Sequence, residues 1–178
     1  MRNAVYQLID REIELAKAGK DAYMILKMNS LSDEGMILKL YEASNAGVKI
    51  RLIVRGMCCL VPQQPGFSEN ITVISIVDRF LEHARVWIFG NDGNEKIYLS
   101  SADWMTRNID RRLEVSFPVV DPLLVKEIKD ILDLQLRDNT KARVINAAND
   151  NRYVKKRKNE MSYRAQLDTY HYLKQKNK

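Results

Sequence analysis

The sequence predicts an α/β domain in which a mixed, mostly parallel sheet is flanked by helices. Its 178 residues, 46% hydrophobic and 29% charged, have the length and composition of one globular domain. Short apolar runs alternate with amphipathic stretches in the first third of the chain, as strands alternate with helices in α/β proteins. A strand, a helix and a strand joined by short connections form a βαβ unit, whose right-handed crossover makes the two strands parallel.

The N-terminal part is expected to form helix, strand, helix and strand in that order. Apolar residues recur every three to five positions over residues 3–18, which predicts an amphipathic helix. Residues 23–28 are a nearly unbroken apolar run, typical of a strand that is covered on both faces. A second helix is predicted from Ser32 to just before Gly47, and residues 50–54 form the next buried strand.

The middle of the chain is predicted to complete the sheet. Residues 91–94, Asn-Asp-Gly-Asn, are a strong signal for a hairpin turn. Asp121 as N-cap and Pro122 at the first helical position predict a further helix. The additional strands are expected at residues 71–77, 86–89, 97–100 and 115–119.

Basic residues are concentrated in the C-terminal part. The net charge is +6, but residues 137–178 hold 12 Lys and Arg against 4 Asp and Glu, so the rest of the chain is slightly acidic. We therefore divide the chain into a domain at residues 1–139 and a basic, helical extension at residues 140–178 that packs on or flanks it. The run at residues 155–158 can attract nucleic acid, acidic lipid or polyphosphate, or it is simply a solvated face. His171, in the predicted last helix, is interpreted as a half-buried packing residue.

Several classes of protein are excluded by composition. No run approaches the roughly 20 apolar residues that span a bilayer, and the N-terminus does not resemble a signal peptide, so we expect a soluble, cytoplasmic chain with no transmembrane segment. Cys58 and Cys59 are adjacent and have no partners at metal-ligand spacing, so no metal site is predicted. The common nucleotide-binding loops are also absent from the sequence.

Cations and one histidine lie next to the ends of predicted strands. Lys27 closes the first strand and Arg55, followed by Gly56, closes the second, where ligands bind in parallel sheets. His83 stands just before another strand, and residues 100–108 with Arg111 and Arg112 add hydroxyls, an aspartate and three arginines. This collection predicts a phosphate site that acts by positioning and charge neutralisation. The alternatives are a surface salt bridge for Arg55 and a purely structural role for His83.

Three long blocks of the sequence resemble the C-terminal catalytic domain of bacterial polyphosphate kinase, at residues 52–58, 74–83 and 98–112. This family reversibly transfers the terminal phosphate of ATP to inorganic polyphosphate. The resemblance continues at residues 25–29, 151–153 and 164–166, so it covers nearly the whole chain.

The resemblance implies a phospholipase-D-like domain that faces a similar domain across an active-site tunnel, each donating one histidine. It implies that the phosphorylated histidine lies in the first domain, outside this chain. His83 then contacts the transferring phosphate as a proton donor or electrostatic stabiliser. Arg55 then binds the phosphates of ATP. Lys27 is expected beside it because of its place at the neighbouring strand end. Further polyphosphate contacts are expected at Arg85, Arg107, Arg111 and Arg112.

Cofactor and partners follow from the same resemblance. Mg²⁺ is expected to accompany ATP in the full enzyme, with its ligands outside this fragment because no acidic cluster here has suitable spacing. The partners are ATP or ADP, inorganic polyphosphate and the missing N-terminal part of the polypeptide, in a homo-oligomer; no nucleic acid is expected. Cytoplasmic location is expected, with peripheral attachment to the inner membrane as an alternative. Arg85 and Asp103 depart from the H-x-K and G-S-x-N patterns of phospholipase D, so their roles stay open.

Two other functions remain alternatives at this point. A phospholipase-D-like nuclease with one histidine would complete its site by dimerising. A polyanion-binding module without enzymatic activity would use residues 140–178 alone, and changing Arg55 would then leave binding intact. In the kinase interpretation the isolated chain folds but is inactive, because it lacks the nucleophile.

Overall fold

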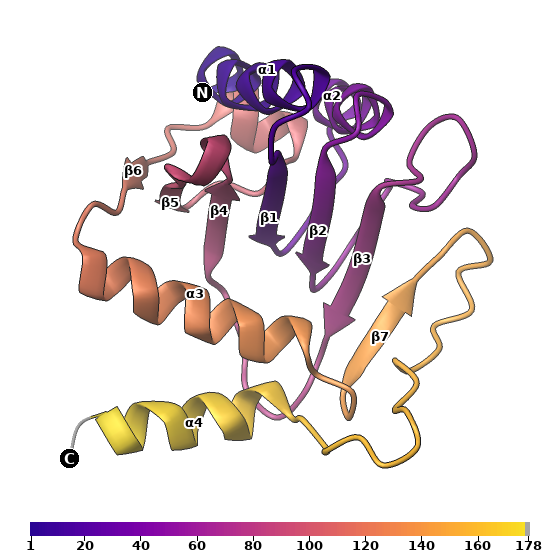
Figure 1. The fold of residues 1–178 in the computed structure, drawn as a ribbon, viewed down its shortest axis with the longest axis vertical. Helices are drawn as coiled ribbons and strands as arrows, with labels where there is room; N and C mark the ends of the chain where they lie inside the picture. The colour runs from indigo at the N-terminus through magenta and orange to yellow at the C-terminus, as the bar shows by residue number, and fades with distance from the viewer. Residues whose placement is uncertain (177–178) are drawn as a thin grey trace.

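The computed structural model describes residues 1–176 and contains a seven-stranded sheet between two layers of helices (Figure 1). The helices are α1 (Arg2–Lys17), α2 (Glu34–Asn45), α3 (Pro122–Leu136) and α4 (Ala165–Lys176), with a single 3-10 turn at Asn91–Gly93 and a single π turn at Arg107–Arg111. The strands are β1 (Tyr23–Met28), β2 (Lys49–Val54), β3 (Ile71–Ile76), β4 (Arg85–Phe89), β5 (Lys96–Ser100), β6 (Ser116–Pro118) and β7 (Ala142–Ile145).

The strands are arranged in the order β6-β5-β4-β1-β2-β3-β7. β2 pairs in parallel with β1 and with β3, which confirms the predicted βαβ unit and the mixed sheet. The prediction of a mostly parallel sheet is wrong, because the other four pairings are antiparallel. The reason lies in the connections: a parallel pair needs a crossover of a dozen or more residues, whereas β4 and β5 are joined by the tight turn at residues 91–94.

Helix caps predicted from the sequence are present, with one shift. Asp33 is the N-cap of α2, and its carboxylate accepts a hydrogen bond from the Met36 N–H at 3.0 Å, so this helix begins later than the predicted Ser32. Asp121 caps α3 by accepting from the next two N–H groups beyond Pro122, as predicted. Across residues 1–176, no helix is both long and apolar enough to span a bilayer.

The core is double, because β1 is buried on both faces as predicted. Met24, Leu26 and Met28 pack beneath α1 and α2, while Ile25 lies in the second cluster, against α3. Each large apolar side chain that is fully buried contributes about 1.5–3 kcal/mol, so the two clusters hold the helices against the sheet.

Residues 140–176, predicted as a helical extension, contribute a strand to the sheet as well as a helix to the second helical layer. β7 is antiparallel to β3 at the edge of the sheet, and α4 lies along α3 (Figure 1). The four cations at residues 155–158 are exposed. His171 is also exposed, so its interpretation as a half-buried packing residue is wrong.

Candidate functional site

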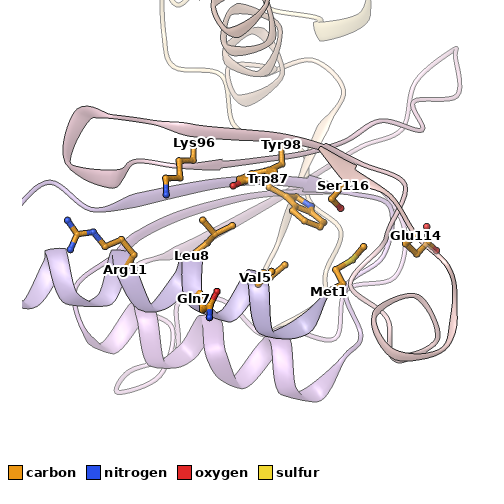
Figure 2. A pocket seen from close by; sticks show the side chains of 11 residues that line it. Met1, Val5, Gln7, Leu8, Arg11, Trp87, Lys96, Tyr98, Glu114 and Ser116 are labelled. Carbon is orange, nitrogen blue, oxygen red and sulfur yellow. The ribbon is translucent and has the colours of Figure 1, made fainter. Parts of the chain in front are cut away.

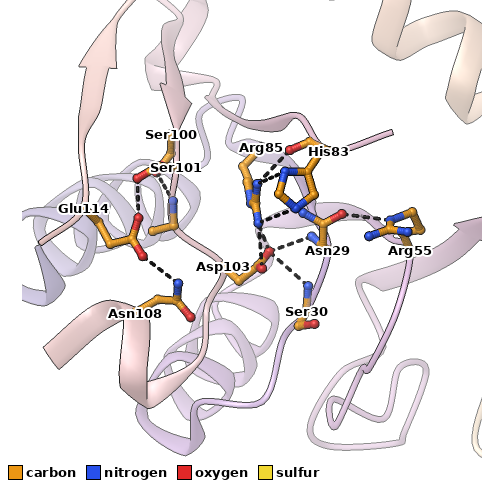
Figure 3. Close-up of polar contacts among 11 residues, drawn as sticks. Asn29, Ser30, Arg55, His83, Arg85, Ser100, Ser101, Asp103, Asn108 and Glu114 are labelled. Atoms are coloured by element: carbon orange, nitrogen blue, oxygen red, sulfur yellow. Dashed lines mark hydrogen bonds and ion pairs between the residues drawn. The ribbon is translucent and has the colours of Figure 1, made fainter. Parts of the chain in front are cut away.

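Three segments meet at one edge of the sheet, where the carboxyl ends of the central strands β1 and β2 lie. Asn29 follows β1 and Arg55 follows β2, and parallel strands end at the same edge. Arg85 begins β4, which is antiparallel to β1, so the start of β4 lies beside the end of β1, with Val86 opposite Lys27. The fold therefore brings residues from distant parts of the sequence into the cluster shown in Figure 3.

Arg85 connects the predicted histidine to a buried carboxylate. Its Nη1 atom lies 3.0 Å from Nδ1 of His83 and donates to the His83 carbonyl oxygen at 2.8 Å. On its other side Nη2 donates to Oδ2 of Asp103 at 3.0 Å. Nη2 also lies 3.4 Å from Nε2 of His83, so the guanidinium contacts both nitrogens of the ring and fixes its plane without assigning its proton. Arg85, whose role the sequence left open, thus orients His83.

The carboxylate of Asp103 accepts four hydrogen bonds. Oδ1 accepts from the backbone N–H groups of Asn29 and Ser30 at 2.8 and 3.1 Å and from Nε of Arg85 at 3.3 Å, in addition to the Oδ2 bond. Burial by itself would raise the pKa of Asp103, but the hydrogen bonds from Arg85 and the two N–H groups outweigh it and lower the pKa. The carboxylate is therefore charged, and it supports the site rather than facing a ligand.

Asn29 connects this network to Arg55. Its Oδ1 atom accepts from Nε of Arg55 at 2.9 Å, and Figure 3 shows His83 and Arg55 on either side of Asn29. The close approach of the Gly56 backbone to the Asn29 backbone depends on the missing side chain of Gly56. Its N–H donates to the Asn29 carbonyl at 2.8 Å, and a Cβ at Gly56 would lie 3.0 Å from that oxygen. Sequence reasoning missed Asn29, because an asparagine after a strand carries no signal of its own.

A second branch of polar contacts joins Ser101, Glu114 and Asn108. Glu114 accepts from Ser101 and from Nδ2 of Asn108 at 2.6 Å, and the pKa of Glu114 is lowered chiefly by the Ser101 hydrogen bond. The π turn at Arg107–Arg111 lies beside this branch. The predicted polyphosphate contacts Arg107, Arg111 and Arg112 are all exposed.

Lys27 lies elsewhere than the sequence suggested. Its side chain points to the α3 side of the sheet and is 6% exposed; Nζ donates to Glu82 and to Oε1 of Gln135, the latter at 2.7 Å. Burial lowers the pKa of Lys27, and the Glu82 carboxylate opposes this shift. The ammonium is thus neutralised within the protein, and its geometry gives no support to a direct phosphate contact.

The fold also contains a cavity that shares only Glu114 with the residues labelled in Figure 3. It has a volume of about 510 Å³ and lies between α1 and the strands β4 to β6 (Figure 2). Leu8, Trp87 and Tyr98 are among its lining residues, whereas His83, Arg85 and Arg55 are not. His83 is exposed, so the candidate site lies at the surface and not in this cavity.

Comparison with known proteins shows which family the chain is similar to. A model of the polyphosphate kinase C-terminal domain 2 family matches residues 1–166. A polyphosphate kinase of Yersinia pestis is 56% identical over 173 residues, which are 97% of this chain and 25% of that protein. The crystal structure of polyphosphate kinase from Porphyromonas gingivalis is 53% identical, with a TM-score of 0.95 over 99% of this chain and 27% of that one.

The wider fold is that of phospholipase D. Nuc from Salmonella typhimurium, a phospholipase D family member, has a TM-score of 0.54 at 10% identity, covering 76% of this chain and 89% of that chain. The predicted phospholipase-D-like class is therefore confirmed. The chain spans about a quarter of the length of the curated relatives it matches. With the family model covering nearly all of its length, the chain belongs to the polyphosphate kinase family, as its C-terminal domain 2.

Proposed function

We propose that this domain forms one half of the active site of a polyphosphate kinase, which reversibly transfers the terminal phosphate of ATP to inorganic polyphosphate. Membership of the family supports the reaction. The observation that carries the proposal is the continuous hydrogen-bonded chain from Arg55 through Asn29, Asp103 and Arg85 to His83 at one edge of the sheet.

In this proposal Arg55 grips the phosphates of ATP. Because Nε is held by Asn29, its two Nη groups are left to donate to phosphate oxygens. His83, whose two ring nitrogens lie 3.0 and 3.4 Å from the guanidinium of Arg85, acts on the transferring phosphate as a proton donor or electrostatic stabiliser. Such oriented donors stabilise charge that develops on oxygen without having to reorganise during the reaction.

The transfer takes two balanced steps in this proposal. The bond between the terminal phosphorus and the bridging oxygen of ATP breaks as a bond to a histidine nitrogen of the missing domain forms, and ADP leaves. That phosphorus–nitrogen bond then breaks as the terminal oxygen of polyphosphate attacks the phosphorus. Arg55 and His83 act in both steps, because charge moves between phosphate oxygens in each. Homo-oligomerisation of the full enzyme belongs to the same proposal.

The residues of this chain do not fit a magnesium site. Within residues 1–176 there is no group of three or more His, Cys, Asp or Glu side chains that could hold a metal ion. Asp103, the carboxylate nearest to His83 in the network, is already occupied by Arg85 and two backbone N–H groups. We therefore propose that residues outside this chain hold the Mg²⁺ that accompanies ATP.

The experiment uses a full-length polyphosphate kinase in which this sequence is the C-terminal quarter. His83→Ala and Arg55→Ala are expected to lower kcat in both directions, by about 10²–10³ for a lost preorganised donor. Arg51→Ala is the matched control, because Arg51 is an exposed arginine on the same strand that Arg55 follows. A normal kcat in His83→Ala would refute the role of His83.

The 178-residue chain by itself distinguishes the alternatives. Incubated with labelled ATP and Mg²⁺ it is expected to give neither polyphosphate nor a phosphorylated protein, because the nucleophilic histidine is missing. Phosphorylation of His83 would contradict the proposal. Hydrolysis of a phosphodiester by the isolated chain would instead favour a dimeric nuclease.

A further inference from the structure

The loop that carries His83 lacks a backbone scaffold of its own. Residues 77–84 connect β3 to β4 without regular secondary structure, and in the described part of the chain no backbone–backbone hydrogen bond involves them. Three of their side chains, Val77, Phe80 and Leu81, are large, apolar and exposed. A segment of this kind needs other contacts to keep one conformation.

Those contacts come from the start of α4, 86 residues later in the sequence. The side-chain amide of Gln166 forms two hydrogen bonds with the backbone of Phe80, as a neighbouring strand would. The Phe80 N–H donates to Oε1 at 2.9 Å, and Nε2 donates to the Phe80 carbonyl at 2.8 Å. Arg164 forms a two-point ion pair with Asp78, at 2.8 Å from Nε and 2.7 Å from Nη2. Both interactions fix the backbone within five residues of His83.

Glu82, the residue directly before His83, is held from the same side. Nε2 of Gln166 also donates to Oε1 of Glu82 at 3.1 Å, while Oε2 accepts from Gln135 at 3.0 Å and from the buried Lys27. The loop is thus fixed at alternate positions, 78, 80 and 82. Lys27, which sequence reasoning assigned to phosphate, contributes here to holding the loop.

The backbone next to Arg164 and Gln166 is itself held by hydrogen bonds to the end of α3. Asp138, 1% exposed at the end of α3, accepts the Ala165 N–H at 2.7 Å and three further N–H groups from residues 140–142. Asn139 accepts the Tyr163 N–H at 2.8 Å. The start of α4 therefore cannot shift without breaking contacts to buried groups, and it provides a firm base for the loop.

We propose that Arg164 and Gln166 are positioning residues, which hold residues 77–84 so that His83 meets the transferring phosphate. The proposal rests on the function proposed for His83. It assigns residues 164–166 a role distinct from that of the exposed cations at residues 155–158. A displacement of about 1 Å in a reacting group can cost about 10²-fold in rate, so loss of either grip is expected to lower kcat by about tenfold to a hundredfold.

The test compares Arg164→Ala and Gln166→Met in the full-length enzyme, with Met chosen because it keeps the volume of Gln166 but removes its amide. The expected result is a lower kcat with nearly unchanged KM for ATP, because Arg55 remains in place. Tyr172→Phe is the matched control: it removes a hydrogen bond of 2.8 Å between α4 and Asp130 of α3, far along the same helix, and is expected to leave kcat unchanged. If Arg164→Ala does not fold, Arg164→Lys replaces it in the test, because lysine keeps the charge but cannot form the two-point ion pair.

A second set of variants separates this proposal from the function on which it rests. In a His83→Ala background, Arg164→Ala and Gln166→Met are expected to cause no further loss of kcat, since they act through His83. Full additivity there, or normal kcat in both single variants while His83→Ala is impaired, would overturn the positioning role. Normal kcat in His83→Ala would instead refute the function proposed for His83. A kcat loss in Tyr172→Phe equal to that in Arg164→Ala would trace the effect to docking of α4 in general and would also overturn the proposal.

Discussion

Asp103→Asn is expected to destabilise the domain, because it removes the charge that balances Arg85 inside the site. The two side chains are 9% and 11% exposed, so little water can replace the lost partner. The amide oxygen of the new Asn can still accept from the N–H groups of Asn29 and Ser30, as Oδ1 does. Its NH₂ group then stands where Oδ2 was, and two donors face each other at the Arg85 Nη2 position.

The size of the effect follows from burial and geometry. Removing one partner of a buried ion pair costs about 3–5 kcal/mol, because the remaining charge is left without compensation. The lower end applies, since Nε of Arg85 keeps an acceptor at the Oδ1 position. We expect a loss of about 3 kcal/mol in the free energy of unfolding, which in a chain of this size lowers Tm by about 6–12 °C.

Urea unfolding of the 178-residue chain measures this loss, with Arg85→Gln and the double variant completing a cycle. The double variant is expected to be more stable than the sum of the single losses predicts, by about 1–3 kcal/mol. Asp133→Asn is the control, because its ion pair with Arg137 is half exposed and contributes about 0.5 kcal/mol. If Asp103→Asn is no worse than this control, or the cycle is additive, the buried pair does not stabilise the site as argued.

Three further predictions follow from individual groups. The pKa of Asp33 is lowered to about 2, chiefly by its hydrogen bond from Arg2, so its stabilisation is complete above about pH 4 and is lost as pH falls through about 2. Asp33→Asn should therefore cost about 2 kcal/mol at pH 7, with the difference from the parent chain closing over that range in urea titrations; a constant difference would contradict it. Burial raises the pKa of Cys58 to about 11, so iodoacetamide at pH 8 should label the exposed Cys59 first, as peptide mass spectrometry would show, and equal labelling would refute this. Replacing the four cations at residues 155–158 with alanine in the full-length enzyme should weaken polyphosphate binding mainly at low salt and leave kcat nearly unchanged; a large kcat loss would place these cations in the active site.

Local signals determined most of the secondary structure. The caps at Asp33 and Asp121, the turn at residues 91–94 and the apolar run at residues 23–28 act within a few positions of the chain, so the sequence could be interpreted without knowing what packs where. Family resemblance likewise rests on contiguous blocks. Contiguous residues alone therefore pointed to His83, to Arg55 and to the phospholipase-D-like class.

What only the tertiary structure decided depends on contacts between distant segments. The direction of β4 places Arg85 beside Asn29, and no pattern within residues 85–89 reveals that direction. The sequence marks Lys27 as a cation at a strand end, but which face it points to depends on the pairing of β1, and there Glu82 neutralises it. The two hydrogen bonds between Gln166 and Phe80 join residues that are 86 positions apart. No local sequence pattern predicts hydrogen bonds of this kind. The residues around each partner give no sign of the other, and only the folded sheet brings the two together.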